Sequence, residues 1–352
     1  LHDALPIFSI PSGAGSGTLS ADSLTVGSAG LEPLDVTGTP DEVSVATTTA
    51  DDVLEVSQDA TTLAILVVST TGSMESVTLV VPADLFEILA HAPGVTVRIL
   101  TDLLLPGATF RIVAAHIVAD GVVIDTRGGA ADGDVELAAG TADDAEASVA
   151  LTDTGLYAAS VTLSATATAT PASASTVAVS PQAAVTLDGA TVVAAGGDVT
   201  IAARVVADAT AESLPDATAD DDAVDAALAL AEVTSSATAL VTGAATIDAG
   251  GILRIEARNA TTVRVVADAR GATAGGAVAV AIVDASSSAR LETSGAIAAR
   301  EVIVDAETVA DVAVNATASP GGATQNDTDP STTTGGAAET PGGAIGVAGA
   351  LA

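Results

Sequence analysis

The stretch AAGGDVTIAA at Ala194–Ala203 decides the fold, because the chain repeats it. Similar stretches follow as DAGGILRIEA at Asp248–Ala257 and AAREVIVDA at Ala298–Ala306, and a weaker copy, AADGDVELAA, precedes at Ala130–Ala139. The copies are spaced by roughly 64, 54 and 50 residues, which is typical of solenoid, propeller or array repeats. The sequence therefore predicts a repetitive architecture.

The similarity extends beyond this motif, so the repeating unit is longer than ten residues. Ala226–Gly251 aligns without a gap with Gly276–Glu301. The alignment matches three pairs of apolar residues: Val233 with Val283, Val241 with Leu291, and Ile247 with Ile297.

Within each copy, apolar residues occupy every second position on both sides of a short turn. Val199, Ile201 and Ala203 follow the turn at Gly196 and Gly197 in this way. Since alternate residues of a strand point to opposite faces, the pattern predicts a half-buried strand, a turn and another half-buried strand. The third copy has one residue fewer in the turn but keeps its apolar face, which a turn between strands tolerates.

Two segments have a second interpretation. Asp222–Val233 has the Asp cap and the Ala and Leu content of a helix, but its repeat partner Gly275–Ala285 alternates Val with Ala and favours a strand. Pro82–Pro93 fits either a short helix or a further strand.

Strands that repeat without obvious hairpin turns or intervening helices predict an all-β fold, a parallel β-helix (β-solenoid), in which each unit stacks on its neighbours. A β-sandwich array would carry several Asn-Gly or Asp-Gly hairpins per copy, and these are scarce. A propeller would carry periodic aromatic residues, but aromatics are 1% of the chain. Polar insertions of variable length fall at one place in each unit, where loops would project from one side of the stack: Ala211–Val224, Arg270–Gly276 and Ser319–Gly343.

Four regions are expected along the chain. Residues 1–7, LHDALPI, resemble a translated sequencing adapter and are expected not to be native protein. Residues 8–42 are rich in Gly, Ser and Thr and predict a linker, residues 43–127 predict irregular β rungs, and residues 128–352 predict the repetitive β-solenoid. Gly342–Ala352 matches Gly275–Ala285, so we expect another strand there and an array truncated at the C-terminus.

The charge is one-sided, with 10 basic residues, all arginine, against 45 acidic residues and a net charge of -35. Such a polyanion repels nucleic acid and anionic membranes, so neither is an expected partner. The charge fits a solvated surface that keeps a β-protein soluble and discourages pairing of strand edges. Cysteine is absent, which excludes disulfides, and no apolar run approaches the ~18 residues of a membrane helix, so no membrane insertion is expected.

Residues that could carry chemistry are few, and we predict no catalytic, cofactor-binding or metal-binding residue. The three histidines, His2, His91 and His116, do not have metal-ligand spacing, and the absence of lysine excludes a P-loop. The closest group of bases, Arg254, Arg258 and Arg264, fits outward strand or turn positions paired with residues such as Glu256. Calcium in the acidic loops Asp220–Asp222 and Asn326–Pro330 is the alternative, although neither has EF-hand spacing.

The glycine-turn unit and the G-A-V-A-V-A-type strand before it resemble filamentous-haemagglutinin-like and autotransporter-type adhesins, which are large bacterial surface proteins. Leu105–Arg127 also resembles the opening of the solenoid in giant multi-repeat exoproteins of Gram-negative bacteria. The resemblance covers roughly Gly94–Ala352 and rests on core and turn positions. It implies export, a right-handed parallel β-helix, and a role in adhesion or biofilms, and it supplies no catalytic residues.

These observations predict a structural or adhesive segment of a secreted or cell-surface bacterial protein and not an enzyme. The segment would be a stalk with a binding surface in its inserted loops, located outside the cell or on its outer surface. Expected partners are a host or neighbouring-cell surface, extracellular matrix or polysaccharide. The alternatives are a polysaccharide lyase or hydrolase built on a β-helix, a calcium-binding exoprotein, and an acid-adapted, salt-tolerant protein whose charge reflects its habitat.

Overall fold

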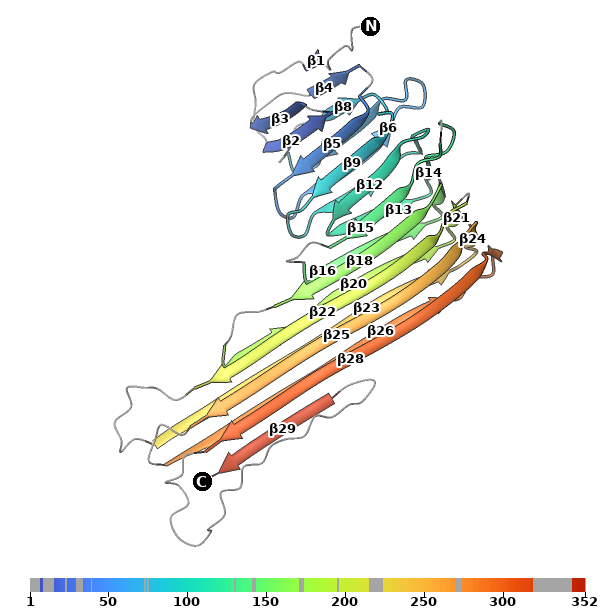
Figure 1. Cartoon of the computed structure of the whole chain (residues 1–352). Helices are drawn as coiled ribbons and strands as arrows, with labels where there is room; N and C mark the ends of the chain where they lie inside the picture. Colours follow the sequence, from blue (N-terminus) through green and yellow to red (C-terminus); the bar gives the residue numbers. More distant parts are fainter. Residues whose placement is uncertain are drawn as a thin grey trace.

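The computed structural model describes residues 7–8, 16–22, 24–29, 34–38, 40–72, 74, 76–129, 131–140, 144–170, 174–194, 196–214, 224–269, 274–318 and 344–351. These residues form no helix, and their strands make up three sheets (Figure 1). The prediction of an all-β fold is confirmed.

We name the three sheets A, B and C. Sheet A has 13 strands: β1 (Ile7–Phe8), β4 (Leu34–Thr37), β6 (Val53–Gln58), β7 (Ile65–Ser69), β8 (Val77–Leu79), β10 (Thr96–Ile99), β13 (His116–Asp120), β16 (Glu146–Thr152), β19 (Thr176–Val179), β20 (Gln182–Asp188), β23 (Val224–Thr242), β26 (Ala274–Leu291) and β29 (Ala344–Leu351). Sheet B has ten: β2 (Ser16–Ala21), β3 (Leu24–Ala29), β5 (Glu42–Thr47), β9 (Leu85–Ala90), β12 (Thr109–Ala114), β15 (Val135–Ala139), β18 (Val161–Ala169), β22 (Val199–Ser213), β25 (Ile252–Asp268) and β28 (Glu301–Thr317). Sheet C has six: β11 (Leu103–Leu104), β14 (Val123–Asp125), β17 (Gly155–Ala158), β21 (Thr191–Ala194), β24 (Thr246–Ala249) and β27 (Ile297–Ala298).

From β10 onward the chain visits the sheets in the order A, C, B and then A again, and one circuit has two successive strands, β19 and β20, in sheet A. Each such circuit adds a strand beside the strand of the previous circuit, as when β16, β17 and β18 pair in parallel with β20, β21 and β22. The sheets are therefore mostly parallel, and the topology is compatible with a parallel β-helix.

The strand register confirms the repeat alignment. The three aligned pairs are hydrogen-bonded neighbours in the structure: Val233 with Val283, Val241 with Leu291, and Ile247 with Ile297. Within the segment Asp222–Val233, residues 224–233 lie in strand β23, as the repeat partner predicted, and residues 222–223 lie outside the described residues.

The interval of about 64 residues between the first two motif copies contains two circuits rather than one. Val135 pairs with Val161, and Val161 pairs with Val199, so β18 lies between the copies. The sequence did not reveal this copy because Ala159 and Ser160 occupy its turn in place of glycine.

The N-terminal part is different from the prediction, because it contains antiparallel hairpins. β2 pairs antiparallel with β3, and β7 pairs antiparallel with β6 and β8. The predicted linker at residues 8–42 holds β2, β3 and β4, since Thr, Ser and Val alternate there well enough to form strands. Pro82–Pro93 contains β9, a strand. Residues 1–6 of the suspected adapter segment lie outside the described residues.

A side chain completes the first strand of sheet C. The Gln58 amide accepts a hydrogen bond from the Leu104 N–H at 2.6 Å and donates to the Leu104 carbonyl at 3.1 Å and to the Leu63 carbonyl at 3.0 Å. These are the two bonds that a neighbouring backbone would make with Leu104. Because an unpaired strand edge invites association, Gln58 and the antiparallel hairpins together cap the N-terminal end of the sheets.

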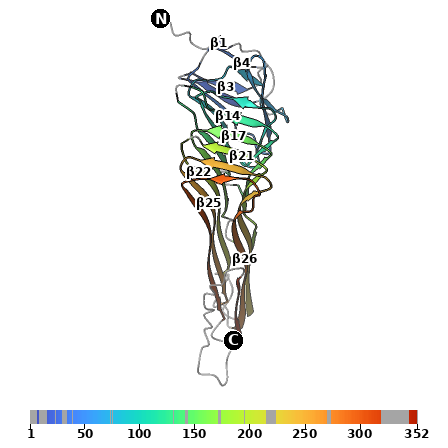
Figure 2. The same ribbon diagram turned by 90° about the vertical axis from the view of Figure 1, so that its right-hand side faces the viewer.

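Toward the C-terminus the strands of sheets A and B become much longer. Sheet B strands grow from 5 residues in β15 to 9 in β18, 15 in β22 and 17 in β25. The added residues of sheets A and B extend beyond the short strands of sheet C. They form an arm of two facing layers, which Figure 2 shows edge-on.

The part enclosed by all three sheets and the arm have separate hydrophobic cores. The first core contains the large side chains, including Phe86 and Phe110, which stack with ring centroids 5.5 Å apart. The core of the arm consists of alanine and valine only. Small inward side chains let the two layers of the arm approach closely.

A buried polar cluster lies between the two cores. The Asn259 amide donates to the Ser235 and Ser286 carbonyls, both at 3.0 Å, and accepts from the Thr261 hydroxyl at 3.0 Å. The Ser235 and Thr261 hydroxyls bond to each other at 2.9 Å. Ser235, Asn259 and Thr261 are at most 2% exposed, so their polar atoms depend on these bonds.

The last strand differs in direction from the repeat. The match of Gly342–Ala352 to Gly275–Ala285 predicts a strand beside β26, and β29 lies there, but it pairs antiparallel. Alternation of small and apolar residues is the same in both directions, so the pattern predicted the sheet edge and not the strand direction.

Candidate functional site

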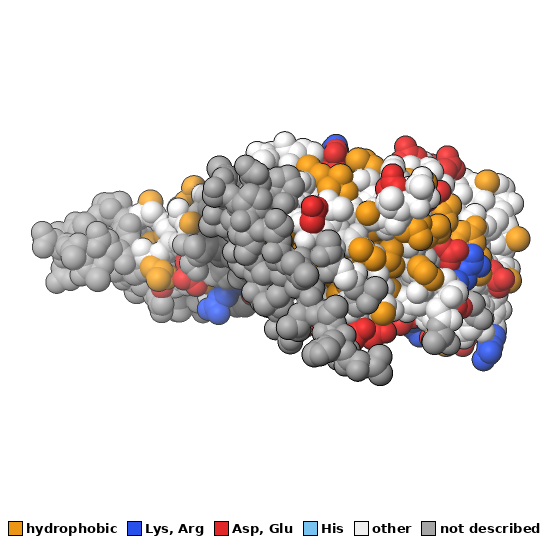
Figure 3. All heavy atoms as spheres, turned by 90° about the horizontal axis from the view of Figure 1, so that it is seen from above, with side chains coloured by type: hydrophobic (Ala, Val, Ile, Leu, Met, Phe, Trp, Pro, Cys, Tyr) orange, Lys and Arg blue, Asp and Glu red, His pale blue; other side chains and the backbone are white. Residues whose placement is uncertain are grey.

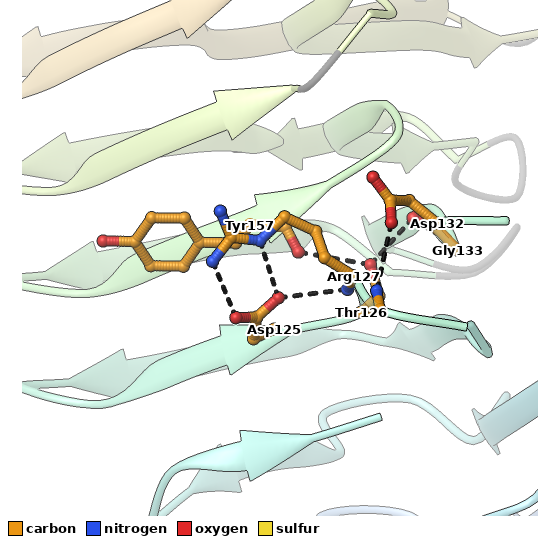
Figure 4. Close-up of polar contacts among 7 residues, drawn as sticks. Asp125, Thr126, Arg127, Asp132, Gly133 and Tyr157 are labelled. Atoms are coloured by element: carbon orange, nitrogen blue, oxygen red, sulfur yellow. Dashed lines mark hydrogen bonds and ion pairs between the residues drawn. The ribbon is translucent and has the colours of Figure 1, made fainter. Parts of the chain in front are cut away.

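The candidate site lies at the corner where the chain passes from sheet C to sheet B. Asp125 ends β14, Arg127 follows it, and Tyr157 lies on β17, one circuit further along (Figure 4). The register pairs Asp125 with Tyr157, so the two side chains are neighbours on the outer face of sheet C.

The Arg127 side chain donates two hydrogen bonds to the Asp125 carboxylate, and the Arg127 backbone N–H donates a third, at 3.0 Å. Its Nε donates to Oδ1 at 2.9 Å and its Nη2 to Oδ2 at 2.8 Å, while the guanidinium carbon lies 4.3 Å from the centre of the Tyr157 ring. The Arg127 side chain, through these bonds, lowers the pKa of Asp125, and burial opposes this shift. The same bonds raise the pKa of Arg127, so both groups remain charged at neutral pH.

The loop that follows is held by its own polar groups. The Thr126 hydroxyl donates to the Gly133 carbonyl at 2.7 Å and to the Tyr157 carbonyl at 3.2 Å. The Asp132 carboxylate accepts from the Gly128 N–H at 3.0 Å (Figure 4). The corner is thus fixed before any ligand binds.

A shallow groove of about 450 Å³ runs beside this loop and crosses successive circuits. It is lined by seven residues of the corner turns: Ala131, Asp132, Asp134, Ala159, Ser160, Gly196 and Gly197. The Asp134 carboxylate accepts from the Ser160 N–H at 3.0 Å and hydroxyl at 2.7 Å. Asp198 makes the equivalent bond to the Ile252 N–H at 2.8 Å, so these aspartates join the turn of one circuit to the next.

The groove therefore offers carboxylates, backbone groups and a nearby cation, which suit hydrogen bonding to a polar ligand such as a sugar. Both of its carboxylates already accept hydrogen bonds from the turns. Within the described residues, no three His, Asp or Glu side chains gather closely enough to hold a metal ion. On the face seen in Figure 3, acidic side chains are spread out and not gathered into one patch.

The structure places the residues considered from the sequence at separate positions. His116 is half-buried, with its Nδ1 2.9 Å from the Ser148 hydroxyl, and His91 is exposed. His2 and the acidic loops Asp220–Asp222 and Asn326–Pro330 lie outside the described residues.

The predicted outward positions of the three arginines are confirmed. Arg254, Arg258 and Arg264 lie on the outer face of β25, and Arg254 pairs with Glu256 at 2.7 Å. The sequence did not reveal the contact between Arg127 and Tyr157, because the two residues belong to different circuits. Only the short spacing of Asp125 and Arg127 hinted at a pair.

Comparisons with protein-family models, with curated proteins and with solved structures find no match for this chain. Across the described ranges, no helix is long and apolar enough to cross a membrane.

Proposed function

We propose that this chain is a structural and adhesive segment of a large secreted or cell-surface bacterial protein, built as a right-handed parallel β-helix. The observation that carries the proposal is the parallel register of successive circuits, which extends the molecule in one direction. Crossovers between parallel strands are right-handed in about 98% of proteins, which supports the handedness.

The side chains fit a load-bearing role better than a catalytic one. Inward positions are filled by apolar residues, and the corner aspartates bond neighbouring turns. The capped N-terminal end and the acidic surface discourage random association of edges. Such a segment would act as a stalk, with its specificity in the insertions between sheets B and A.

The corner groove supports a second candidate, a β-helix that acts on polysaccharides. Glycosidases and lyases use paired carboxylates, and Asp132 and Asp134 line the groove beside Arg127. An Arg127→Gln variant keeps a polar side chain there but removes its charge.

One experiment separates the two candidates. The full chain is incubated with a panel of acidic and neutral polysaccharides, and both retention on the immobilised polymer and release of new reducing or unsaturated ends are measured. The structural proposal expects retention without product. Product release that is lost in Asp132→Asn or Asp134→Asn would overturn it in favour of the enzyme.

A further inference from the structure

On sheet A, the arm exposes its larger apolar side chains and buries its alanines. The inward positions of β23 and β26 hold six alanines that are at most 5% exposed: Ala227, Ala229, Ala231, Ala277, Ala279 and Ala281. The outward positions between them hold five larger residues, which we name the outer stripe: Leu228, Leu230, Val278, Val280 and Ile282. Three of these, Leu228, Val278 and Ile282, are 59%, 45% and 41% exposed. A sheet with one solvated face normally has the opposite arrangement, with the larger apolar residues inside.

The outer face of sheet B is polar at the same level of the arm. Asp208 on β22 and Thr262 and Arg264 on β25 are exposed there. The inward residues of these two strands pack in one core with the alanines of β23 and β26, so the two outer faces lie back to back. Single exposed apolar residues are common on proteins, but a contiguous set on one face is typical of an interaction site.

The outer stripe lies on a face of the sheet and not at its edge. β23 has β19 and β20 on one side and β26 on the other, and β29 joins the far side of β26. Because strands add to a sheet in its plane, further circuits would extend this face and not cover it. The insertions next to the arm contain no Val, Leu, Ile, Met or aromatic residue, so they offer no large apolar side chain to pack on the stripe: residues 171–173, 215–223, 270–273 and 319–343.

Charge indicates the kind of partner that fits this face. Glu232 follows Leu230 at the next outward position of β23, Asp284 follows Ile282 on β26, and both carboxylates are exposed. β19 and β23 contain no basic residue, and the one arginine of β26, Arg290, lies near the C-terminal end of that strand. Two outer stripes brought together would add carboxylates and no base to the interface, between chains of net charge -35 each, which disfavours a second copy.

We propose that the outer stripe binds an amphipathic helix of a basic partner protein, which would add a third layer to the arm on sheet A. A helix packs on a sheet through an apolar stripe along one of its faces. The outward positions from Ala226 to Glu232 span about 20 Å at ~3.3 Å per residue, a length that about 14 helical residues cover. Apolar side chains of the helix would contact the outer stripe, and Lys or Arg at one end of the helix would face Glu232 and Asp284.

The probe is a synthetic peptide of about 18 residues, made of equal numbers of Leu and Lys, with Leu at the i, i+3, i+4, i+7 spacing of an amphipathic helix. One control peptide has Glu in place of every Lys. A second control has the same composition as the probe but alternates Leu with Lys, which is the pattern of a strand and not of a helix.

A fluorescent label reports where the peptide binds. Because the chain has no cysteine, Thr234→Cys gives the full chain a single attachment site for an environment-sensitive fluorophore beside the outer stripe. Thr262→Cys places the same fluorophore on the outer face of sheet B. We expect the helical Lys peptide to shift the emission of the first label and not of the second, and both control peptides to bind at least about tenfold more weakly.

Substitutions in the labelled chain test the face itself. Leu228→Thr, Val278→Thr and Ile282→Thr together remove apolar surface but keep residues that favour strands, and they are expected to weaken binding at least about tenfold. Val309→Thr is the matched control, because Val309 is 52% exposed on β28, in sheet B, and should leave binding unchanged. Since all these side chains point outward, every variant should unfold within a few degrees of the unsubstituted chain, as circular dichroism would show.

Several results would overturn the proposal. Equal responses of the two labels would show that the peptide binds by charge alone, and equal binding of the Glu peptide would show that charge does not select the partner. Tighter binding of the alternating peptide would replace the helix by a strand. A dimer in sedimentation velocity that the triple Thr variant loses would identify a second copy as the occupant. Binding to phosphatidylcholine vesicles that the same variant loses would identify a lipid surface.

Discussion

Gly128 and Gly140 have nearly the same φ angle but lie in different surroundings. Their φ angles are +99° and +93°, in the region that disfavours residues with a Cβ atom. A Cβ on Gly140 would overlap the carbonyl oxygen of Thr166, whereas a Cβ on Gly128 would only touch the Pro106 side chain. A Cβ atom at Gly128 would therefore introduce backbone strain alone. At Gly140 it would introduce the same strain and a clash with the neighbouring circuit.

Alanine at these two positions should therefore have unequal effects. We expect Gly128→Ala to lower the free energy of unfolding by about 1 kcal/mol through strain alone. Gly140→Ala adds a clash with main chain that cannot move freely, so it should cost at least about 2 kcal/mol more. Urea unfolding measures both, and equal losses would contradict the close approach.

The pair of Asp125 and Arg127 makes a small contribution that depends on pH. Because the folded-state pKa of Asp125 is lowered, its contribution is present above the unfolded pKa, about 3.9, and is lost as pH falls through the folded value. Exposure of Arg127 keeps the contribution below about 1 kcal/mol. We expect Arg127→Met to raise the pKa of Asp125, as measured by NMR titration of its carboxyl carbon. An unchanged pKa would mean that the bonds shown in Figure 4 do not persist in solution.

The polar cluster of Ser235, Asn259 and Thr261 acts at the scale of an element, because it lies where two long strands leave the three-sheet part and enter the arm. An apolar stripe of small residues could pair in several registers, since alanine fits many neighbours. Asn259 bonds to carbonyls of both β23 and β26, so a shifted strand would leave its amide unsatisfied. The cluster thus favours one register.

Substitutions in this cluster should be strongly non-additive. Asn259→Val alone removes one hydrogen-bond partner of each of the two buried hydroxyls and both donors to the Ser235 and Ser286 carbonyls, and it is expected to cost about 3 kcal/mol. Adding Ser235→Ala and Thr261→Val removes those hydroxyls, so the triple variant should recover about 1–2 kcal/mol relative to the sum of the single variants. Urea unfolding of the set measures the coupling, and simple additivity would contradict a network.

The alternation of apolar and polar residues predicted the strands well. It predicted which strands pair only where the turns of the two circuits have similar sequences. Val233 and Val283 were matched because the whole unit around them repeats. The copy at β18 was missed because its turn lacks glycine, and the direction of β29 was wrong because alternation has no direction. The corner contact of Arg127 with Tyr157 depends on stacking of circuits, so short-range patterns do not contain it.

At the scale of the whole molecule, the net charge of -35 opposes folding. Only ten arginines offset the acidic residues, and several of them pair on the outer face of sheet B. Compaction brings like charges together, and salt reduces their repulsion. The Debye length falls from about 30 Å at 0.01 M salt to about 8 Å at 0.15 M, which is shorter than most distances across the molecule.

Raising NaCl from about 0.01 to 0.15 M should therefore raise the midpoint of thermal unfolding by a few degrees, because screening removes more repulsion from the folded chain than from the expanded one. CaCl₂ at the same ionic strength is the control, measured by calorimetry on the full chain.

Equal shifts of the unfolding midpoint with the two salts would assign the effect to screening of a solvated acidic surface. A clearly larger shift with calcium would identify bound cations and favour the calcium-binding alternative, because an ion that binds only the folded state stabilises it by mass action. A midpoint that falls with NaCl would mean that ion pairs, such as Arg111 with Glu87, outweigh the repulsion.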